Sequence, residues 1–307
     1  MKKLLICILL FCIPLYFVKG IKSTPQTLET PEAPEAPVNQ CVIYVKVNDE
    51  EIALNQYLVG VLAGEMPASF HAEALKAQAI AARTYALRQT DYGKKEIQAT
   101  TAHQVFESEE KRKEKWKAVF STYENKIEQA IAATGNQVLT YDGQLITAMF
   151  HASSSKQTES AKNYSGQEIP YLRSAMSIEK PLSESVSFSF AELNERLKQK
   201  LSADAYRKIS FARNDTNRIQ QVTIDNVVWS GREFRELLQL KSTDFSVKWS
   251  KKGLEITTRG YGHGVGMSQH GANAMAKNGT TVEGILKNYY PGAQIEEANY
   301  CKEVSTQ

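Results

Sequence analysis

One acidic residue stands in apolar surroundings where the chain reads GEMP, residues 64–67. Residues 53–64 carry the apolar spacing of a helix, which Asn55 would cap and which must end before Pro67. Loss of solvation and the negative end of the helix dipole would both raise the pKa of Glu65. Such a carboxyl group can act as a general acid in glycoside cleavage, the alternative being a surface glutamate at a helix end.

A second charge lies in an equally apolar run. Arg83 is eighteen residues beyond Glu65, within FHAEALKAQAIAARTYALRQT, residues 70–90. The alanine, leucine and other strong helix formers of this segment predict a second helix. A guanidinium group in such a helix requires either a buried partner or a bound ligand.

The segment GYGHGVGMSQHGA, residues 260–272, contains five glycines, two histidines, a serine and a glutamine. Its G-x-G-x-G spacing, with no GK[ST] following, excludes the Rossmann and P-loop phosphate sites. Glycine at every second position allows a ligand or another strand to approach the backbone closely. Two interpretations are open: a sugar-binding wall using His263, Ser268 and Gln269, or a tight crossing of two chain segments.

Histidines are the only candidate metal ligands with any grouping in the sequence. His151, His263 and His270 are three potential ligands, but no HExxH pair and no CxxC pair supports them. The serines at 153–155 follow His151 without the G-x-S-x-G pattern of a nucleophile elbow, which favours a polar strand end. We predict neither a metal nor another cofactor.

The remaining elements indicate an α+β fold with helices early and strands late. One helix is expected over residues 111–135, followed by a hairpin around Asp142-Gly143 whose outgoing strand delivers His151. Ser189 and Glu192 form a capping box at the start of another helix. Further elements are expected as strands at 41–47, 218–224, 226–231, 245–250 and 253–260, and as short helices at 272–277 and 282–289. The expected domain is 41–301, with a helical lobe at about 41–135 and a β-rich remainder.

The N-terminal 22 residues carry an export signal. Two lysines precede fifteen uncharged residues, Leu4–Val18, and Lys19 and Lys22 follow. The length suits a signal-peptide core, whereas the missing small-x-small site and Lys19 favour an uncleaved signal anchor. We predict an anchor over 1–22, with a cleaved signal as the alternative, and an exported remainder.

Residues 23–40 contain four prolines and three glutamates without an apolar period, which predicts an extended linker. Cys41 and Cys301 bracket the folded region and would either pair in an oxidising exterior or remain free thiols. Beyond residue 40 the chain has 33 basic and 31 acidic residues. This balance gives no reason to expect a nucleic-acid partner.

Several segments together resemble the stage II sporulation protein D family. They are LNQYLVGVLAGEMPASFHAEALKAQAIAARTYAL, FHASSSKQTES, PYLRS, and GYGHGVGMSQHGANAMAKNG before ILKNYYPG, and they span nearly all of 41–300 in the family's order. The resemblance implies a lytic transglycosylase that cleaves MurNAc-β-1,4-GlcNAc bonds of peptidoglycan to 1,6-anhydro-MurNAc ends. Glu65 would be its acid and base.

The same resemblance implies a substrate-binding set: Arg83, His151, Tyr171, Arg173, His263, Ser268 and Gln269. Arg83 would bind substrate or orient Glu65, and Arg173 in place of a lysine would keep the charge but change its geometry. Some family members hold zinc through a Cys/His cluster that this chain lacks, since KKEIQATTAHQVF retains only His103. The absence of zinc is therefore expected.

The family setting implies a single-pass protein of the mother-cell membrane with an extracytoplasmic catalytic domain. It would work with stage II sporulation proteins P and M on stripped glycan strands during engulfment. Two other function classes remain open: a glycan-binding modifier of a wall amidase that cuts nothing, and a metal-dependent wall hydrolase.

Overall fold

The computed structural model describes residues 42–47, 49–100 and 103–299. The expected anchor at 1–22, the linker at 23–40 and both Cys41 and Cys301 lie outside these residues, so the predictions about them stay predictions. Within the described residues, no helix combines the length and the apolar character that a membrane span requires.

The chain first forms a hairpin and two helices. Strands β1 (Tyr44–Val47) and β2 (Glu50–Ala53) pair antiparallel and lead into α1 (Leu54–Glu65) and α2 (Ala72–Thr90). The prediction of Asn55 as the cap of α1 is wrong, because Ala53 occupies that position without a side-chain hydrogen bond. The end of α1 before Pro67 is confirmed, and it leaves Glu65 as the last helical residue.

The single helix expected over 111–135 is two helices. Helix α3 (Glu109–Trp116) is followed by a short 3₁₀ turn at Lys117–Val119 and then by α4 (Phe120–Ala132). Lys117 adopts φ 46°, which an α-helix cannot contain, and this residue breaks the segment. An ion pair of 2.6 Å between Arg112 and Glu124 holds the two helices together.

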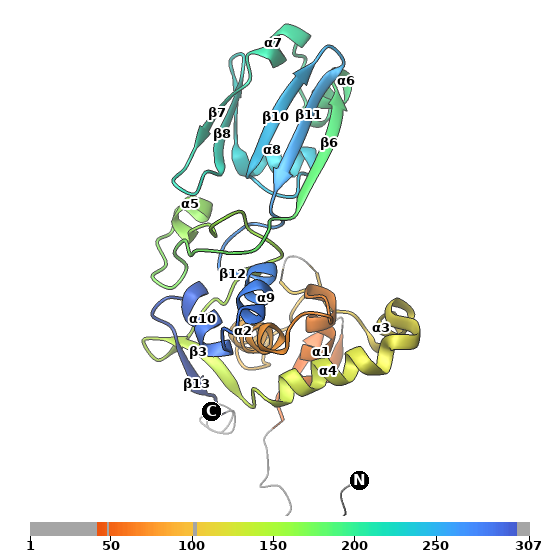
Figure 1. Ribbon diagram of the computed structural model, residues 1–307, viewed down its shortest axis with the longest axis vertical. Helices are drawn as coiled ribbons and strands as arrows, with labels where there is room; N and C mark the ends of the chain where they lie inside the picture. The colour runs from red at the N-terminus through yellow and green to blue at the C-terminus, as the bar shows by residue number, and fades with distance from the viewer. Residues whose placement is uncertain (1–41, 48, 101–102, 300–307) are drawn as a thin grey trace, which may run out of the picture. The chain divides into compact units, whose positions relative to one another are not determined.

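The helical core is assembled from both ends of the domain. Helices α9 (Gln269–Lys277) and α10 (Val282–Tyr289) pack against α2, as Figure 1 shows. Side chains of all three helices share one apolar core with residues of the glycine-rich segment, among them Val265 and Met267. The expected division at about residue 135 therefore separates segments that pack together.

The hairpin around Asp142-Gly143 is confirmed. Strands β3 (Gln137–Tyr141) and β4 (Gln144–Leu145) flank the two residues, both of which have positive φ, and β13 (Gln294–Glu297) pairs with the other edge of β3. The strand leaving the turn does not carry His151, contrary to our expectation. His151 lies on β5 (Phe150–His151), which pairs in parallel with β12 (Met267–Ser268).

The β-rich part has a core of its own. One sheet has the order β10-β11-β6 and the other the order β7-β8-β9. The strands are β6 (Ser183–Ser189), β7 (Ser210–Arg213), β8 (Ile219–Ile224), β9 (Val227–Ser230), β10 (Phe245–Ser250) and β11 (Gly253–Arg259). The helices are α5 (Ala161–Ser165), α6 (Phe190–Arg196), α7 (Ala203–Arg207) and α8 (Gly231–Leu238). The capping box of Ser189 and Glu192 is confirmed.

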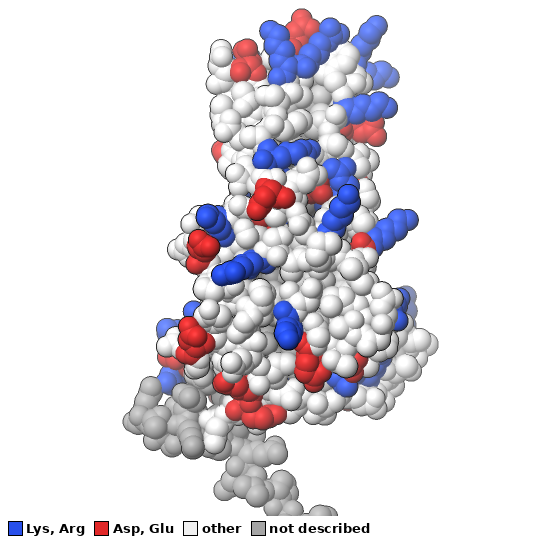
Figure 2. Space-filling model, turned by 60° about the vertical axis from the view of Figure 1, so that its left-hand side comes forward, with Lys and Arg blue, Asp and Glu red and all other residues white. Residues whose placement is uncertain are grey.

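The α+β class, with early helices and later sheets, is confirmed by this order of elements (Figure 1). On the face drawn in Figure 2, basic and acidic side chains are interspersed and form no continuous surface of one sign.

Candidate functional site

Glu65 is a half-buried carboxyl group at the C-terminal end of α1. Its Oε1 accepts a hydrogen bond of 2.7 Å from the backbone N–H of Val105. Burial raises the pKa of Glu65 above its usual value, while hydrogen bonds from Val105 and from the side chain of Gln269 oppose part of that rise. The raised pKa expected from the sequence is confirmed, with desolvation as its main cause.

Gln269 connects this carboxyl group to the glycine-rich segment. Its side chain is 2% exposed, and its Nε2 lies 3.4 Å from Oε1 of Gln78 on α2. Ser268, one residue earlier, caps α9 by accepting a hydrogen bond from the N–H of Gly271. The start of α9 therefore holds the Gln269 amide beside Glu65.

A buried tyrosine, Tyr57, and a half-buried one, Tyr85, complete the surroundings of Glu65. Burial raises the pKa of both Tyr57 and Tyr85, and the nearby charge of Glu65 raises each further. The phenol of Tyr57 donates a hydrogen bond of 3.1 Å to Gln104, whose amide in turn donates to the carbonyl of Ala82. Both phenols thus remain protonated beside the carboxyl group.

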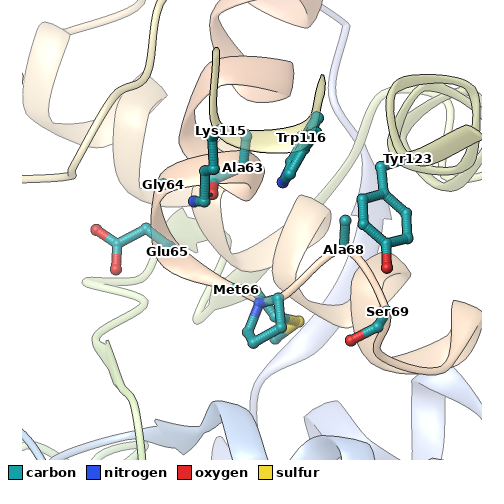
Figure 3. Close-up of a pocket in the computed structure, with 10 residues that line it drawn as sticks. Ala63, Gly64, Glu65, Met66, Ala68, Ser69, Lys115, Trp116 and Tyr123 are labelled. Carbon is teal, nitrogen blue, oxygen red and sulfur yellow. Dashed lines mark hydrogen bonds between the residues drawn. The ribbon is translucent and has the colours of Figure 1, made fainter. Parts of the chain in front are cut away.

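A pocket of about 310 Å³ lies beside the loop that follows Glu65. Its walls include Lys115, Trp116 and Tyr123 from α3 and α4, together with the backbone of residues 63–69. In Figure 3 the carboxyl group of Glu65 points away from Trp116 and Tyr123. Glu65 therefore lines this pocket from the side opposite those two aromatic rings, and its carboxyl group also contacts Val105 and Gln269.

His151 and His263 lie together, next to the paired strands β5 and β12. The pairing of β5 with β12 sets His151 opposite Ser268, and the rings of His151 and His263 are 5.7 Å apart. Burial, followed by the charges of His263 and Arg218, holds the pKa of His151 well below its usual value. Burial and then the charge of Arg235 lower the pKa of His263 to about 4. Both rings are therefore neutral near pH 7.

Neutral His151 is fixed in one tautomer by its two contacts. Nδ1 lies 3.2 Å from the carbonyl oxygen of Val265 and must donate to it, which leaves Nε2 to accept the hydroxyl of Ser154 at 2.6 Å. No sequence pattern predicted Ser154 as this donor. The histidine is thus held by the fold at both ring nitrogens.

Glu179 is a buried acidic residue that no sequence pattern predicted, since no apolar period surrounds it. Its Oε1 accepts hydrogen bonds of 2.6 Å from the hydroxyl of Ser268 and 2.7 Å from the N–H of Ser154. It therefore joins the segment after β5 to the N-terminus of α9. Ser268 is fully buried and serves this connection.

The alternating glycines permit a close crossing with residues 149–154. Gly260, Gly262, Gly264 and Gly266 all have positive φ, which side chains rarely adopt. A Cβ on Gly266 would stand 1.9 Å from the carbonyl oxygen of Met149, and one on Gly262 would stand 2.8 Å from the Cβ of His151. Of the two interpretations of this segment, these contacts favour the tight crossing of two chain segments over the sugar-binding wall, because the protein's own chain fills the space beside the glycines.

The other three predicted binding residues lie apart from these contacts. Arg83 is fully buried and donates to Thr134 Oγ1 at 3.1 Å and to the carbonyl of Gln137 at 3.0 Å, so it has found its partner inside the fold. The phenol of Tyr171 accepts the N–H of Thr147 at 3.2 Å. Arg173 is exposed.

The structure thus brings Glu65 together with Gln269, and His151 together with His263 and Ser268. Val105 and Gln78 are additional residues of the site; both lie in the segments quoted above but carry no chemical signal of their own. Within the described part of the chain, no three His, Cys, Asp or Glu side chains are grouped to hold a metal ion. The expectation of a metal-free protein remains a prediction.

Sequence comparisons with known proteins identify relatives of this chain. Residues 46–141 match the family described as "SpoIID: Stage II sporulation protein". The stage II sporulation protein D of Bacillus subtilis (strain 168) is 40% identical over 263 residues, which cover 81% of this chain and 76% of the relative. The chain belongs to the stage II sporulation protein D family. The resemblance inferred from the sequence is thereby confirmed.

Two further proteins are similar in sequence to this chain. The stage II sporulation protein D of Bacillus amyloliquefaciens is 38% identical over 264 residues, covering 81% of this chain and 76% of that protein. A protein named amidase enhancer, from Bacillus subtilis (strain 168), is 28% identical over 296 residues, covering 78% of this chain and 40% of its own length. The similarity thus extends to a protein with a different name.

Replacement of Glu65 by glutamine should stabilise the protein at high pH. The pKa of Glu65 is higher in the folded state than in the unfolded state. Below the unfolded-state pKa the carboxyl group is protonated in both states and has no effect on stability. As pH rises above that value and through the folded-state pKa, the cost of ionising the buried carboxyl group lowers the free energy of unfolding. The melting temperature of Glu65→Gln should therefore exceed that of wild type at pH 8, and the difference should vanish near pH 4. Exposed Glu50→Gln is the control, and a difference independent of pH would contradict the raised pKa.

Replacement of Arg83 by methionine should lower the free energy of unfolding by about 2–4 kcal/mol, because the partners at the end of α4 lose their buried donor. Binding of glycan by the folded fraction should stay within about twofold of wild type, since loss of a side chain outside a site leaves its contacts intact. Urea unfolding and a binding titration measure the two effects. A loss of affinity without a loss of stability would restore a binding role for Arg83.

Proposed function

We propose that this protein is a lytic transglycosylase of peptidoglycan, a lyase that cleaves MurNAc-β-1,4-GlcNAc bonds and leaves 1,6-anhydro-MurNAc ends. The observation that carries the proposal is the state of Glu65: a half-buried carboxyl group with a raised pKa and two hydrogen-bond donors placed on it. Membership of the stage II sporulation protein D family supports the same conclusion.

A single carboxyl group suffices for this reaction. Glu65 in its acid form donates a proton to the glycosidic oxygen, and the bond between that oxygen and the anomeric carbon breaks. The anomeric carbon belongs to MurNAc, and the C6 hydroxyl oxygen of the same MurNAc then bonds to it. The Glu65 carboxylate removes the proton from that C6 hydroxyl as the new bond forms. No water is added, and Glu65 returns to its acid form.

The surroundings of Glu65 suit both halves of this cycle. Burial favours the acid form that must be present when substrate binds. The N–H of Val105 and the amide of Gln269 stabilise the carboxylate that forms after proton donation. Of the two acids nearest in sequence, Glu73 has a pKa lowered by its hydrogen bond from Lys76, and Glu51 is exposed.

The proposal includes a cellular setting that follows from the family. The protein would be held in the mother-cell membrane by its N-terminal segment, with the domain from residue 41 outside the cytoplasm. It would act on glycan strands freed of stem peptides, with stage II sporulation proteins P and M as partners, during engulfment.

A second candidate function is a non-enzymatic modifier of a wall amidase. The similarity to the amidase enhancer of Bacillus subtilis favours it. In that case Glu65 would serve binding alone, and Glu65→Gln would stimulate the amidase as well as wild type does.

Mass spectrometry of stripped glycan strands, incubated with residues 41–307, tests the main proposal. Wild type should generate anhydro-MurNAc ends, and Glu65→Gln should reduce them by at least about 10²-fold, since a catalytic proton transfer is lost. Glu50→Gln is the matched control and should retain wild-type yield. Ends that have gained water would indicate a hydrolase, and activity lost on chelation would indicate a metal enzyme.

Replacement of Gln269 by alanine should move the alkaline limb of the pH–rate profile. The Gln269 amide lowers the pKa of Glu65, so its removal raises that pKa and extends the acid form to higher pH. The alkaline limb of kcat/KM should shift to higher pH. The maximum value of kcat/KM should fall, because the carboxylate is less stabilised. Asn278→Ala, at the exposed end of α9, is the control. An unshifted limb would contradict the contact between Gln269 and Glu65.

A further inference from the structure

A second pocket, of about 300 Å³, is lined by residues of α5, β8 and α8 and takes no part in the cleavage proposed above. Its walls include Glu159, Asn163, Tyr164, Arg232, Arg235 and His263. Hydrogen bonds of 2.6 Å from Asn163 to Asp215 and of 2.7 Å from Asn214 to Glu159 fix its two sides together. The pocket is thus a built feature of the fold.

Arg235 is the unusual member of this pocket. It is half-buried, and burial lowers the pKa of its guanidinium group. Its Nε donates to the carbonyl of Leu240 at 3.1 Å, and across the described residues it forms no ion pair with a carboxylate. A partly desolvated cation without a counter-charge is costly, and a bound anion would supply the missing partner.

Other groups add positive potential at the same place. Arg232 lies over the ring of Tyr164, 5.0 Å from its centroid, and pairs with Glu236 at the exposed side. Helix α8 begins at Gly231, so the positive end of its dipole also meets the pocket. The charges of Arg235, Arg218 and Arg232 all contribute to the low pKa of His263. The pocket therefore favours negative charge.

Glu159 does not supply the counter-charge for Arg235. Its Oε1 accepts from the N–H of Ser160 and from Asn163, both at 2.9 Å. Its Oε2 accepts from Asn214 at 2.7 Å and from Thr216 at 3.1 Å. The carboxylate is committed to the wall of the pocket, which leaves the guanidinium nitrogens of Arg235 for a ligand.

We propose that this pocket binds a carboxylate carried by the glycan, with Arg235 and Arg232 as its ligands and Tyr164 as a wall for the sugar ring. This inference rests on the proposed function for the identity of the glycan. MurNAc carries a lactyl group whose carboxyl is free in a stripped strand and blocked as an amide when a stem peptide is attached. A guanidinium pair therefore distinguishes the two kinds of strand.

The pocket and Glu65 are connected through one short segment. His263 lines the pocket, its ring lies beside His151, and His151 stands opposite Ser268. Gln269, the next residue, hydrogen-bonds Glu65. Binding of a glycan carboxylate in the pocket would therefore help to position the strand that is cleaved at Glu65.

Binding measured without cleavage tests the pocket independently of the reaction. Glu65→Gln protein would be titrated with a MurNAc-GlcNAc tetrasaccharide bearing free lactyl carboxylates. The comparison ligands are the same tetrasaccharide converted to lactyl methylamides, the peptide-bearing tetrasaccharide, and chitotetraose. We expect the free carboxylate to bind roughly tenfold tighter than the methylamide or chitotetraose, as charge-assisted hydrogen bonds to arginine imply.

Two variants in the same background assign the effect. Arg235→Gln and Arg232→Gln should each remove most of the preference for the free carboxylate, while Lys251→Gln, on the exposed β10–β11 turn, should keep it. Melting temperatures check the fold. Arg235 also donates a hydrogen bond to the carbonyl of Leu240, so its replacement can destabilise the fold. If Arg235→Gln does not fold, the variant of the exposed Arg232 provides the test.

Equal affinity for the carboxylate and methylamide ligands, or a preference untouched by both variants, would overturn the proposal. Tightest binding of the peptide-bearing ligand, lost in Arg235→Gln, would support the anion pocket and assign it a peptide carboxylate. Anhydro ends from wild type combined with unchanged binding in the variants would overturn the pocket and leave the transglycosylase intact. A preference for the free carboxylate that depends on these arginines, without any cleavage by wild type, would support the pocket and overturn the transglycosylase.

Discussion

The parallel contact between β5 and β12 is the constraint on which the rest of the site depends. It brings residues 150–151 against residues 267–268, more than a hundred positions later in the chain. The contact is so close that glycine is needed around it, as the Met149 carbonyl beside Gly266 shows. Once it is made, α9 begins in a fixed place, and its first residue, Gln269, reaches Glu65.

Glu65 is held between two opposing effects, and this balance suits a group that must both give and take a proton. Burial alone would keep the carboxyl protonated, which would prevent it from acting as a base. Hydrogen bonds from Val105 and Gln269 offset part of that penalty and stabilise the ionised form. The donors come from two distant segments, so the balance exists only in the assembled fold. A site of this kind costs stability, as functional sites commonly do.

The sequence predicted the elements whose signals are local. The end of α1 before Pro67, the hairpin at Asp142-Gly143 and the capping box of Ser189 all depend on a few neighbouring residues. The apolar setting of Glu65 was also local, and its raised pKa followed. The break at Lys117 had no Gly or Pro to announce it. The sequence named Gln269 as a site residue but not as a partner of Glu65, because tertiary contacts place its amide. Val105 was missed altogether, because a backbone N–H carries no sequence signal.

The two arginines show why a buried charge is informative only once its partners are known. Both Arg83 and Arg235 follow from the same physical rule, that a desolvated guanidinium group needs compensation. Arg83 obtains it from Thr134, just after α4, and from the carbonyl of Gln137, the first residue of β3, and its role is thereby structural. Arg235 donates to one carbonyl and lines a pocket. Sequence could identify the first as unusual and pass over the second, because only Arg83 lies in an apolar run. The geometry separates their surroundings: the conspicuous arginine is enclosed by the fold, and the inconspicuous one lines a pocket.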